Sequence, residues 1–381
     1  MAKVQGTAED RFKEVEKLFQ SNLDEGAELG ASIAVNIDGK DVVDLWGGYA
    51  KPDHSQPWEK DTIVNVWSTS KNVTSLAALV CIDRGLLDPY EKVSKYWPEF
   101  AANGKENVEI RHLLSHASGV SGWVEPVTGA DVCDVGKSTA MLAAQAPWWE
   151  PGTASGYHSL TMGHLIGEVV RRVSGKSLSQ FIIEELATPL NADFQLGAKD
   201  EDLGRVAEIV PPPPMDPATI PDSFKDPTSI AFKSLMNPSM DASRANTEVW
   251  RKGEVGAANG HTNARGIVHI LSPISLGGGN LLSPKTIDLI FKEQSNAPDL
   301  VLGQTIRFGI GFGLSGPNSL LDWLPEGRVC AWGGWGGSIV IMDLERKVTI
   351  AYMMNKMETA VMGSERSRAY VRAIYKALGV E

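Results

Sequence analysis

The chain has 381 residues, of which 43% are hydrophobic and 22% are charged, as is typical of a globular protein. Its formal net charge is −11 and it has no basic stripe, which argues against nucleic-acid binding. No apolar run approaches the roughly 18 residues of a membrane span, and the polar start is unlike a signal peptide, so we expect no membrane contact and a cytoplasmic location.

The first elements in chain order are a predicted helix and a predicted β-hairpin. Apolar residues recur at helical spacing in residues 7–24, behind a threonine and an acidic start that favour a helix N-terminus. The β-rich runs 31–37 and 40–46 are separated only by Asp38 and Gly39, a pair that readily adopts the positive φ angles of a two-residue turn.

The middle of the chain is predicted to be helical and rich in loops. Residues 72–85 and 158–187 have helical patterns. The passage 211–238 begins with four consecutive prolines, and we predict neither helix nor central strand there, because proline lacks a backbone N–H. We interpret this passage as an extended surface excursion.

The end of the chain again predicts a hairpin and a helix. The β-rich runs 338–343 and 347–355 flank a short turn, and a helical pattern covers about 360–378. Strand pairs with terminal helices at both ends indicate an α+β fold, an α/β sandwich with one antiparallel sheet built from both termini and flanked by helices, around an inserted helical domain.

The first candidate for chemistry is the sequence WSTSK at 67–71. If a helix begins at Ser68, Lys71 lies one turn later on the same face, where its amine can reach the serine hydroxyl. The helix N-terminus also favours a developing anion. No other lysine has a serine three residues before it. The alternative is a helix-capping serine beside a solvated lysine.

Two further segments are candidates. Tyr157 lies between the turn EPGT at 150–153 and a helical pattern, where a phenol can share protons with a lysine; core packing is the alternative. The segment AWGGWGGS at 331–338 precedes a strand-like run, and its glycines let the backbone approach a ligand closely. A simple glycine-rich turn is the alternative there.

Other chemistries lack their motifs. No serine has the G-x-S-x-G spacing of a nucleophile elbow. His112 and His116 have the i, i+4 separation of a helical metal pair but lack the H-E-x-x-H glutamate and an obvious third ligand, so we expect no metal. The three cysteines are widely spaced and odd in number, which favours reduced thiols over disulfides: Cys81, Cys133 and Cys330.

Taken in order, four segments resemble one known superfamily. They are WSTSK at 67–71, IRHLLSHASGV at 110–120, WEPGTASGYHSLTMGHLIGEVVRRVSGKSL at 149–178 and AWGGWGGSIVIMD at 331–343. They resemble the serine β-lactamase and penicillin-binding-protein superfamily, and particularly its branch of family VIII carboxylesterases and acyltransferases related to class C β-lactamases. The resemblance spans nearly the whole chain and implies a β-lactamase/transpeptidase-like fold.

The resemblance also implies roles for individual residues. Ser68 would be the acylated nucleophile, Lys71 would accept its proton, and Tyr157 would act with the lysine as general base and then protonate the leaving alcohol. The backbone N–H groups of Ser68 and Trp335 would form the oxyanion hole. No cofactor and no metal is implied. We place a sheet domain at 1–66 and 264–381, a helical domain at 67–263, and the active site at their junction.

Two departures from the family pattern bear on the substrate. Ser159 stands where class C β-lactamases carry asparagine, and Trp332 stands where a lysine would meet a substrate carboxylate. Loss of that cation removes a contact of about 1.5–3 kcal/mol, which disfavours carboxylated β-lactams and D-Ala-D-Ala peptides. We therefore expect an apolar or aromatic acyl ester, with Trp332, Gly333, Gly334 and Ser159 among the residues that bind it.

The chain has eleven tryptophans, more than its seven tyrosines or ten phenylalanines. Six lie in or beside the segments named above, which predicts an aromatic-lined pocket with Trp123 and Trp148 among the substrate-binding residues. These six are Trp67, Trp123, Trp148, Trp149, Trp332 and Trp335. Core packing is expected for Trp46 and Trp97.

The sequence thus predicts a serine hydrolase that acts on small or natural-product esters through an acyl-enzyme, with a small-molecule ester as its partner. Three alternatives stay open. An acyltransferase would pass the acyl group to a natural-product alcohol and would differ only in what deacylates the enzyme. A β-lactamase or D,D-peptidase is the second, and a catalytically silent binding protein of the same fold is the third. The acyl group, the alcohol and the oligomeric state are not indicated.

Overall fold

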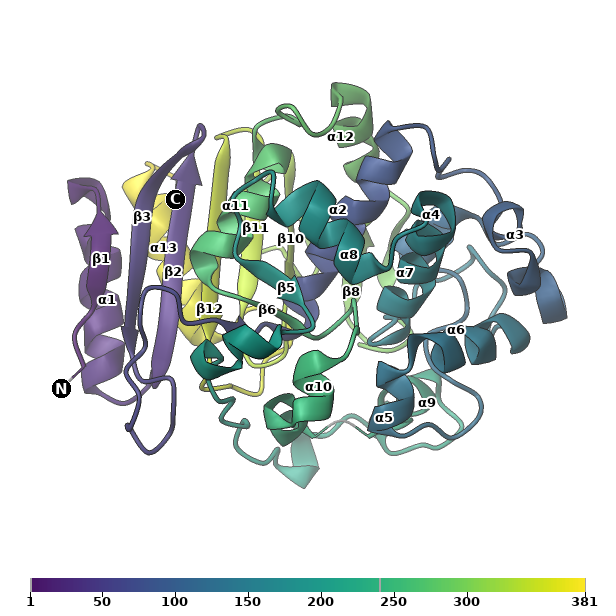
Figure 1. The fold of residues 1–381 in the computed structure, drawn as a ribbon, viewed down its shortest axis with the longest axis horizontal. Coiled ribbons are helices and arrows are strands. Elements are labelled where there is room, and N and C mark those ends of the chain that lie inside the picture. Colours follow the sequence, from purple (N-terminus) through teal and green to yellow (C-terminus); the bar gives the residue numbers. More distant parts are fainter. Residues whose placement is uncertain (1, 240, 381) are drawn as a thin grey trace.

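A nine-stranded antiparallel sheet is the centre of the computed structural model, which describes residues 2–239 and 241–380 (Figure 1). The strand order is β1-β3-β2-β12-β11-β10-β9-β8-β7. Strands from the two ends of the chain meet where β2 (Gly30–Ile37) pairs with β12 (Val348–Met354). The predicted α+β fold, with one sheet built from both termini, is therefore confirmed. The other strands of this sheet are β1 (Gln5–Ala8), β3 (Lys40–Gly48), β7 (Ser295–Pro298), β8 (Thr305–Phe308), β9 (Gly313–Leu314), β10 (Val329–Gly333) and β11 (Ile339–Asp343).

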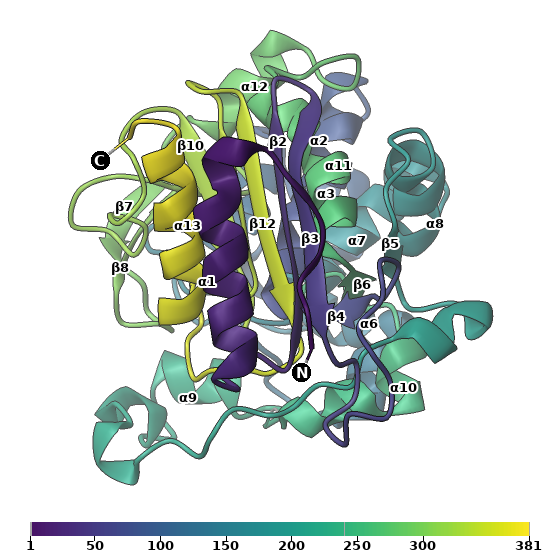
Figure 2. The same ribbon diagram turned by 90° about the vertical axis from the view of Figure 1, so that its left-hand side faces the viewer.

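Helices cover both faces of this sheet. The terminal helices α1 (Lys13–Asp24) and α13 (Glu365–Ala377) lie side by side on one face (Figure 2). On the other face α11 (Ala264–Ser275) packs against β2, β11 and β12. Because both faces are covered, every residue of β12 is buried, and the strand is mostly apolar on both faces rather than alternating.

The helical region lies beyond α11. Its centre is the pair α2 (Ser70–Asp83) and α7 (Thr161–Ser174), which pack against each other. The remaining α-helices are α3 (Val93–Tyr96), α4 (Ile110–Leu114), α5 (Gly129–Cys133), α6 (Val135–Ala144), α8 (Leu178–Ile182), α9 (Ile230–Leu235), α10 (Glu248–Lys252) and α12 (Pro284–Ile290). A small antiparallel sheet has the order β4 (Val64–Asn65), β6 (Gly260–Thr262), β5 (Phe194–Leu196). Nowhere in the described ranges is there a helix both long and apolar enough to cross a bilayer.

Both predicted hairpins are present. Between β2 and β3, Asp38 and Gly39 have φ angles of 50° and 84°, as a tight turn with two left-handed residues requires. Between β11 and β12, Lys347 has a φ of 53° at the end of the turn. Local turn chemistry therefore located both hairpins from the sequence alone.

The predicted helices differ from the observed ones at their ends. The helix predicted over 7–24 begins only at Lys13, since Gln5–Ala8 pairs with β3 as an edge strand. That strand is polar and mostly exposed, so it has no hydrophobic alternation to reveal it. The helical pattern at 158–187 is interrupted after α7, where Gly175 caps the helix with a φ of 75°.

The proline-rich passage 211–238 is only partly as predicted. Its first part contains short 3₁₀ turns, but the helix α9 lies within it, so the prediction that it holds no helix is wrong. The reason is local, because residues 228–236 contain no proline and Ser229 caps the helix by accepting a hydrogen bond from the Phe232 N–H at 2.9 Å.

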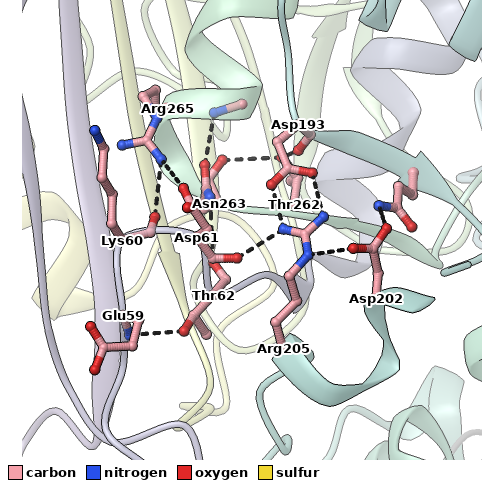
Figure 3. A network of polar contacts seen from close by, with 12 residues as sticks. Glu59, Lys60, Asp61, Thr62, Asp193, Asp202, Arg205, Thr262, Asn263 and Arg265 are labelled. Carbon is pink, nitrogen blue, oxygen red and sulfur yellow. Dashed lines mark hydrogen bonds and ion pairs between the residues drawn. The ribbon is translucent and has the colours of Figure 1, made fainter. Parts of the chain in front are cut away.

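A polar network anchors the chain just before β4 (Figure 3). Arg205 donates to both carboxylate oxygens of Asp193, to Asp202 Oδ1 at 2.7 Å and to the Asp61 carbonyl at 2.8 Å. Arg265, at the start of α11, donates to the Asp61 carboxylate at 3.0 Å and to Asp44 of β3 at 2.7 Å. This Arg205–Arg265 network holds Asp61 where the chain enters β4, a few residues before Ser68.

Candidate active site

Ser68 lies in η2 (Trp67–Thr69), a single 3₁₀ turn that leads directly into α2. Trp67 has a φ of 48°, a left-handed conformation that is uncommon outside glycine and is often found at functional sites. Its ring contacts those of Trp250 and Trp335, at centroid distances of 5.7 and 5.3 Å. Because Trp67 and Thr69 are buried and Ser68 is half-buried, the turn presents the serine at the edge of a rigid framework.

The Lys71 amine reaches Ser68 as predicted from the spacing. Its Nζ lies 3.0 Å from Ser68 Oγ and donates to the carbonyls of Ser159 at 2.7 Å and Ala257 at 2.9 Å. The side chain is buried, and desolvation lowers the pKa of Lys71 well below its ordinary value. A neutral amine has two N–H groups, which the two carbonyls accept, and its lone pair is then free to face the serine.

Tyr157 completes the cluster from the loop before α7. Its Oη lies 2.7 Å from Ser68 Oγ, and the Trp332 indole Nε1 donates to the same Oη at 3.2 Å. The Lys71 Nζ is 4.8 Å from the centroid of the phenol ring. Burial raises the pKa of Tyr157, and its hydrogen bonds with Ser68 and Trp332 only partly oppose this. The phenol is therefore protonated at neutral pH.

Asp299 holds Tyr157 in place and was missed by the sequence reasoning. Its Oδ1 accepts the backbone N–H of Tyr157 at 2.9 Å, and those of Val301 at 2.9 Å and Leu302 at 3.0 Å. The carboxylate is buried in the connection between β7 and β8. An aspartate that bonds to the N–H groups two and three residues on is a local turn signal, but nothing local indicates that Tyr157 is its third donor.

Histidines support the same loop without contacting Ser68. His116 has a φ of 60° and its Nδ1 accepts the His158 N–H at 3.1 Å, while its ring lies 5.1 Å from that of Tyr157. His158 donates from Nδ1 to the Gly156 carbonyl and accepts from Ser118 at Nε2. Burial lowers the pKa of His158 to about 4, so the ring is neutral. These contacts agree with a structural role for His116.

The end of β10 lies against η2. A Cβ on Gly334 would come within 2.4 Å of the Val66 carbonyl and 3.1 Å of Trp67 Cβ, so only glycine fits this approach. Ser338 Oγ donates to the Val66 carbonyl at 3.0 Å and lies 3.0 Å from Thr69 Oγ1. The glycines of the 331–338 segment thus bring the strand end next to η2, the turn that holds Ser68.

Two backbone donors are free at this contact. In the described ranges, the N–H groups of Ser68 and Trp335 have no hydrogen-bond acceptor. The ring of Trp335 packs against the ring of Trp67 in η2. An oxyanion hole requires two unpaired backbone N–H groups that point at the developing oxyanion.

The other residues expected to bind substrate differ in their surroundings. Trp332 is buried against Tyr157 and Phe308, and the Gly333 N–H contacts Met362 Sδ at 3.0 Å. Ser159 is half-buried and contributes its carbonyl to Lys71. Trp148 is half-buried and covers Gly122, where a Cβ would lie 2.8 Å from its ring.

Trp123 does not have the surroundings of a pocket wall. Its side chain is buried, packs edge-on against His164 of α7, and donates from Nε1 to the Ser138 carbonyl of α6 at 3.3 Å. The expectation that it binds substrate is therefore corrected to packing between α6 and α7. The prediction rested on the closeness of Trp123 to the 110–120 motif in the sequence, which does not indicate where its ring points.

Comparisons with known proteins agree with this geometry. Residues 15–374 match the family model described as Beta-lactamase. The chain is 31% identical to the esterase/beta-lactamase LipL of Mycobacterium tuberculosis, over 93% of this chain and 83% of LipL. It is 37% identical to a family VIII carboxylesterase of known structure, with a TM-score of 0.90 over 98% of this chain and 100% of the other. A penicillin-binding protein homologue from Caulobacter crescentus is 34% identical, with a TM-score of 0.88 over 98% and 99%.

Proposed function

The chain belongs to the beta-lactamase family, among its serine esterases, and from that premise we propose that it hydrolyses small carboxylic esters through an acyl-enzyme on Ser68. One observation carries this proposal. Ser68 Oγ lies within hydrogen-bond distance of both Lys71 Nζ and Tyr157 Oη, at 3.0 and 2.7 Å, while both partners are buried and the serine is half-buried.

Acylation begins with attack of Ser68 Oγ on the ester carbonyl. The serine proton passes to the base formed by Lys71 and Tyr157, and burial, which lowers the pKa of Lys71, favours the neutral amine that this step needs. The carbonyl oxygen becomes an oxyanion, which the N–H groups of Ser68 and Trp335 stabilise.

Collapse of the tetrahedral intermediate breaks the bond to the alcohol oxygen. Tyr157 protonates that oxygen, and the proton held by Lys71 restores the phenol, so no proton is gained or lost over the step. Water then attacks the acyl-enzyme by the reverse sequence of proton transfers and releases the acid.

We propose that the substrate lies at the junction of the sheet domain, residues 1–66 and 264–381, with the helical domain, residues 67–263. Trp332 replaces the cation that would bind a substrate carboxylate, so uncharged acyl groups are favoured over β-lactams. The names of the relatives support an ester substrate, since LipL is called an esterase/beta-lactamase and the family VIII protein a carboxylesterase.

The test compares p-nitrophenyl butyrate with the chromogenic β-lactam nitrocefin. Wild-type enzyme should hydrolyse the ester with a much higher kcat/KM than nitrocefin, and Ser68→Ala should lose the ester activity. Adding 1-butanol and measuring butyrate against butyl butyrate tests the acyltransferase alternative. Hydrolysis of nitrocefin at the rate of the ester, or full ester turnover by Ser68→Ala, would contradict the proposal.

A further inference from the structure

Among the residues that the structure describes, Trp332 is the only hydrogen-bond neighbour of the Tyr157 oxygen whose role as donor is fixed by its chemistry. An indole Nε1 carries one hydrogen and accepts none, so at 3.2 Å it can only donate to Tyr157 Oη. Tyr157 Oη therefore accepts the hydrogen bond from Trp332 and donates its own proton to Ser68 Oγ, 2.7 Å away.

At the Lys71 end of the cluster, two carbonyl acceptors fix the direction of the hydrogen bonds. The carbonyls of Ser159 and Ala257 cannot donate, so they take two hydrogens of the Lys71 amine, at 2.7 and 2.9 Å. If Ser68 Oγ accepts from Tyr157, its single proton is directed along the 3.0 Å contact to Lys71 Nζ. The hydrogen bonds then all run in one direction: Trp332 donates to Tyr157, Tyr157 donates to Ser68, and Ser68 donates to Lys71.

The Trp332 ring is held so that this direction is maintained. It is 3% exposed and packs against Tyr157, Phe308 and His116, with ring centroids 5.4, 5.3 and 6.2 Å away. The carbonyl of Trp332 accepts from Asn72 Nδ2 of α2, the helix that carries Lys71, at 3.3 Å. Both its backbone and its ring are therefore tied to the catalytic cluster.

We propose that Trp332 is a positioning residue that directs the hydrogen bonds of the cluster, so that Lys71 takes the Ser68 proton and Tyr157 acts as the acid toward the leaving alcohol. This inference rests on the proposed esterase function and deepens it. When the ester C–O bond breaks, the electron pair stays on the leaving oxygen, and the Tyr157 proton moves to it. The phenolate that forms keeps the Trp332 N–H as a donor, which is a stronger bond to an anion than to a phenol.

The inference predicts an effect that depends on the leaving group. Ethyl butyrate and p-nitrophenyl butyrate give the same acyl-enzyme, so deacylation is common to both and their kcat/KM values differ only through acylation. Ethoxide needs a proton in order to leave, whereas p-nitrophenolate does not. Loss of the Trp332 donor should therefore slow the ethyl ester more than the aryl ester.

The experiment measures both kcat/KM values in wild type, Trp332→Phe, Trp332→His and Phe308→Leu. In Trp332→Phe the ratio of ethyl to aryl kcat/KM should fall about tenfold or more, because general acid catalysis contributes roughly 10²–10⁴-fold. Trp332→His, which restores a ring N–H, should recover part of that ratio. Phe308→Leu disturbs the packing of the indole but keeps its donor, so its ratio should stay within about twofold of wild type.

Labelling of Ser68 by a fluorophosphonate, which loses fluoride and needs no acid, shows that each variant retains a folded site. Equal falls for both esters in a labelled Trp332→Phe, or the same ratio change in Phe308→Leu, would overturn the inference while leaving the esterase function intact. Failure of wild type to be labelled or to hydrolyse either ester would instead overturn the proposed function.

Discussion

The cluster of Ser68, Lys71 and Tyr157 and the Arg205–Arg265 network lie at opposite ends of the β4–β6 strand pair, and they surround their cationic side chains with opposite kinds of groups. In the network each arginine faces carboxylates at 2.5 to 3.0 Å and is partly exposed (Figure 3). In the cluster Lys71 is buried and faces only carbonyls and hydroxyls, so its charge is disfavoured. A cation that anchors the chain needs an anion, whereas an amine that acts as a base needs a lone pair.

Among the variants that separate the two clusters, the largest effect should come from Lys71→Met, which removes the proposed base and nearly preserves the length of the side chain. We expect kcat/KM for p-nitrophenyl butyrate to fall by about 10³-fold or more. Lys105→Met is the matched control, because Lys105 is also buried, donates to the carbonyls of Ala102 and Gln145, and has a pKa lowered to about 8 by burial. A comparable loss of activity in Lys105→Met would contradict a specific role for Lys71.

The difference in stability between wild type and Lys71→Met should depend on pH with a definite sign. Because the pKa of Lys71 is lower in the folded than in the unfolded state, the unfolded chain binds more protons between the two values. The free energy of unfolding of wild type, relative to Lys71→Met, should therefore rise as the pH increases toward the ordinary lysine pKa of about 10. Thermal unfolding of both proteins across this range measures the difference. A constant or falling difference would mean that Lys71 is charged in the folded state.

A smaller effect is expected from Asp299→Asn. The amide keeps one carbonyl oxygen for the three backbone donors but lacks the negative charge that strengthens their bonds, so the Tyr157 loop should loosen. We expect kcat for p-nitrophenyl butyrate to fall by about tenfold, since misplacement of a catalytic group by about 1 Å can cost up to 10²-fold. KM should change less. A rise in KM with kcat unchanged would instead indicate that Asp299 binds the substrate.

The smallest effect on activity should come from the network. Arg205→Gln removes the ion pairs to Asp193 and Asp202, which are partly exposed, and should lower the free energy of unfolding by about 1–2 kcal/mol. That loss should shrink at high salt because the pairs are screened. The kcat should change by less than about threefold. A loss of activity as large as that of Lys71→Met would show that the two clusters are not independent.

Sequence reasoning found the parts of this molecule that depend on residue type and short spacing. The Asp38-Gly39 turn, the three-residue separation of Ser68 and Lys71, and the glycines before β11 each have a local physical cause. The chain order of the motifs and their resemblance to a known family supplied Tyr157. These signals were enough for the fold class and for the residues that meet at Ser68.

The contacts that sequence reasoning missed depend on tertiary packing. The carbonyls of Ser159 and Ala257 hold Lys71, but every residue has a carbonyl, so no residue type indicates them. Asp299 reaches Tyr157 across 142 residues. The direction of the Trp123 ring is likewise set by its neighbours in α6 and α7.

The central claim is that Ser68 carries the acyl group, and intact-mass analysis tests it most directly. Wild type incubated with a fluorophosphonate, or quenched during turnover of p-nitrophenyl butyrate, should gain the mass of one adduct, which peptide mapping should locate on Ser68. Ser68→Ala should gain none and lose turnover by about 10⁴-fold or more, whereas Ser70→Ala should still be labelled. An adduct on another residue, or an unlabelled wild type that still hydrolyses the ester, would contradict the account.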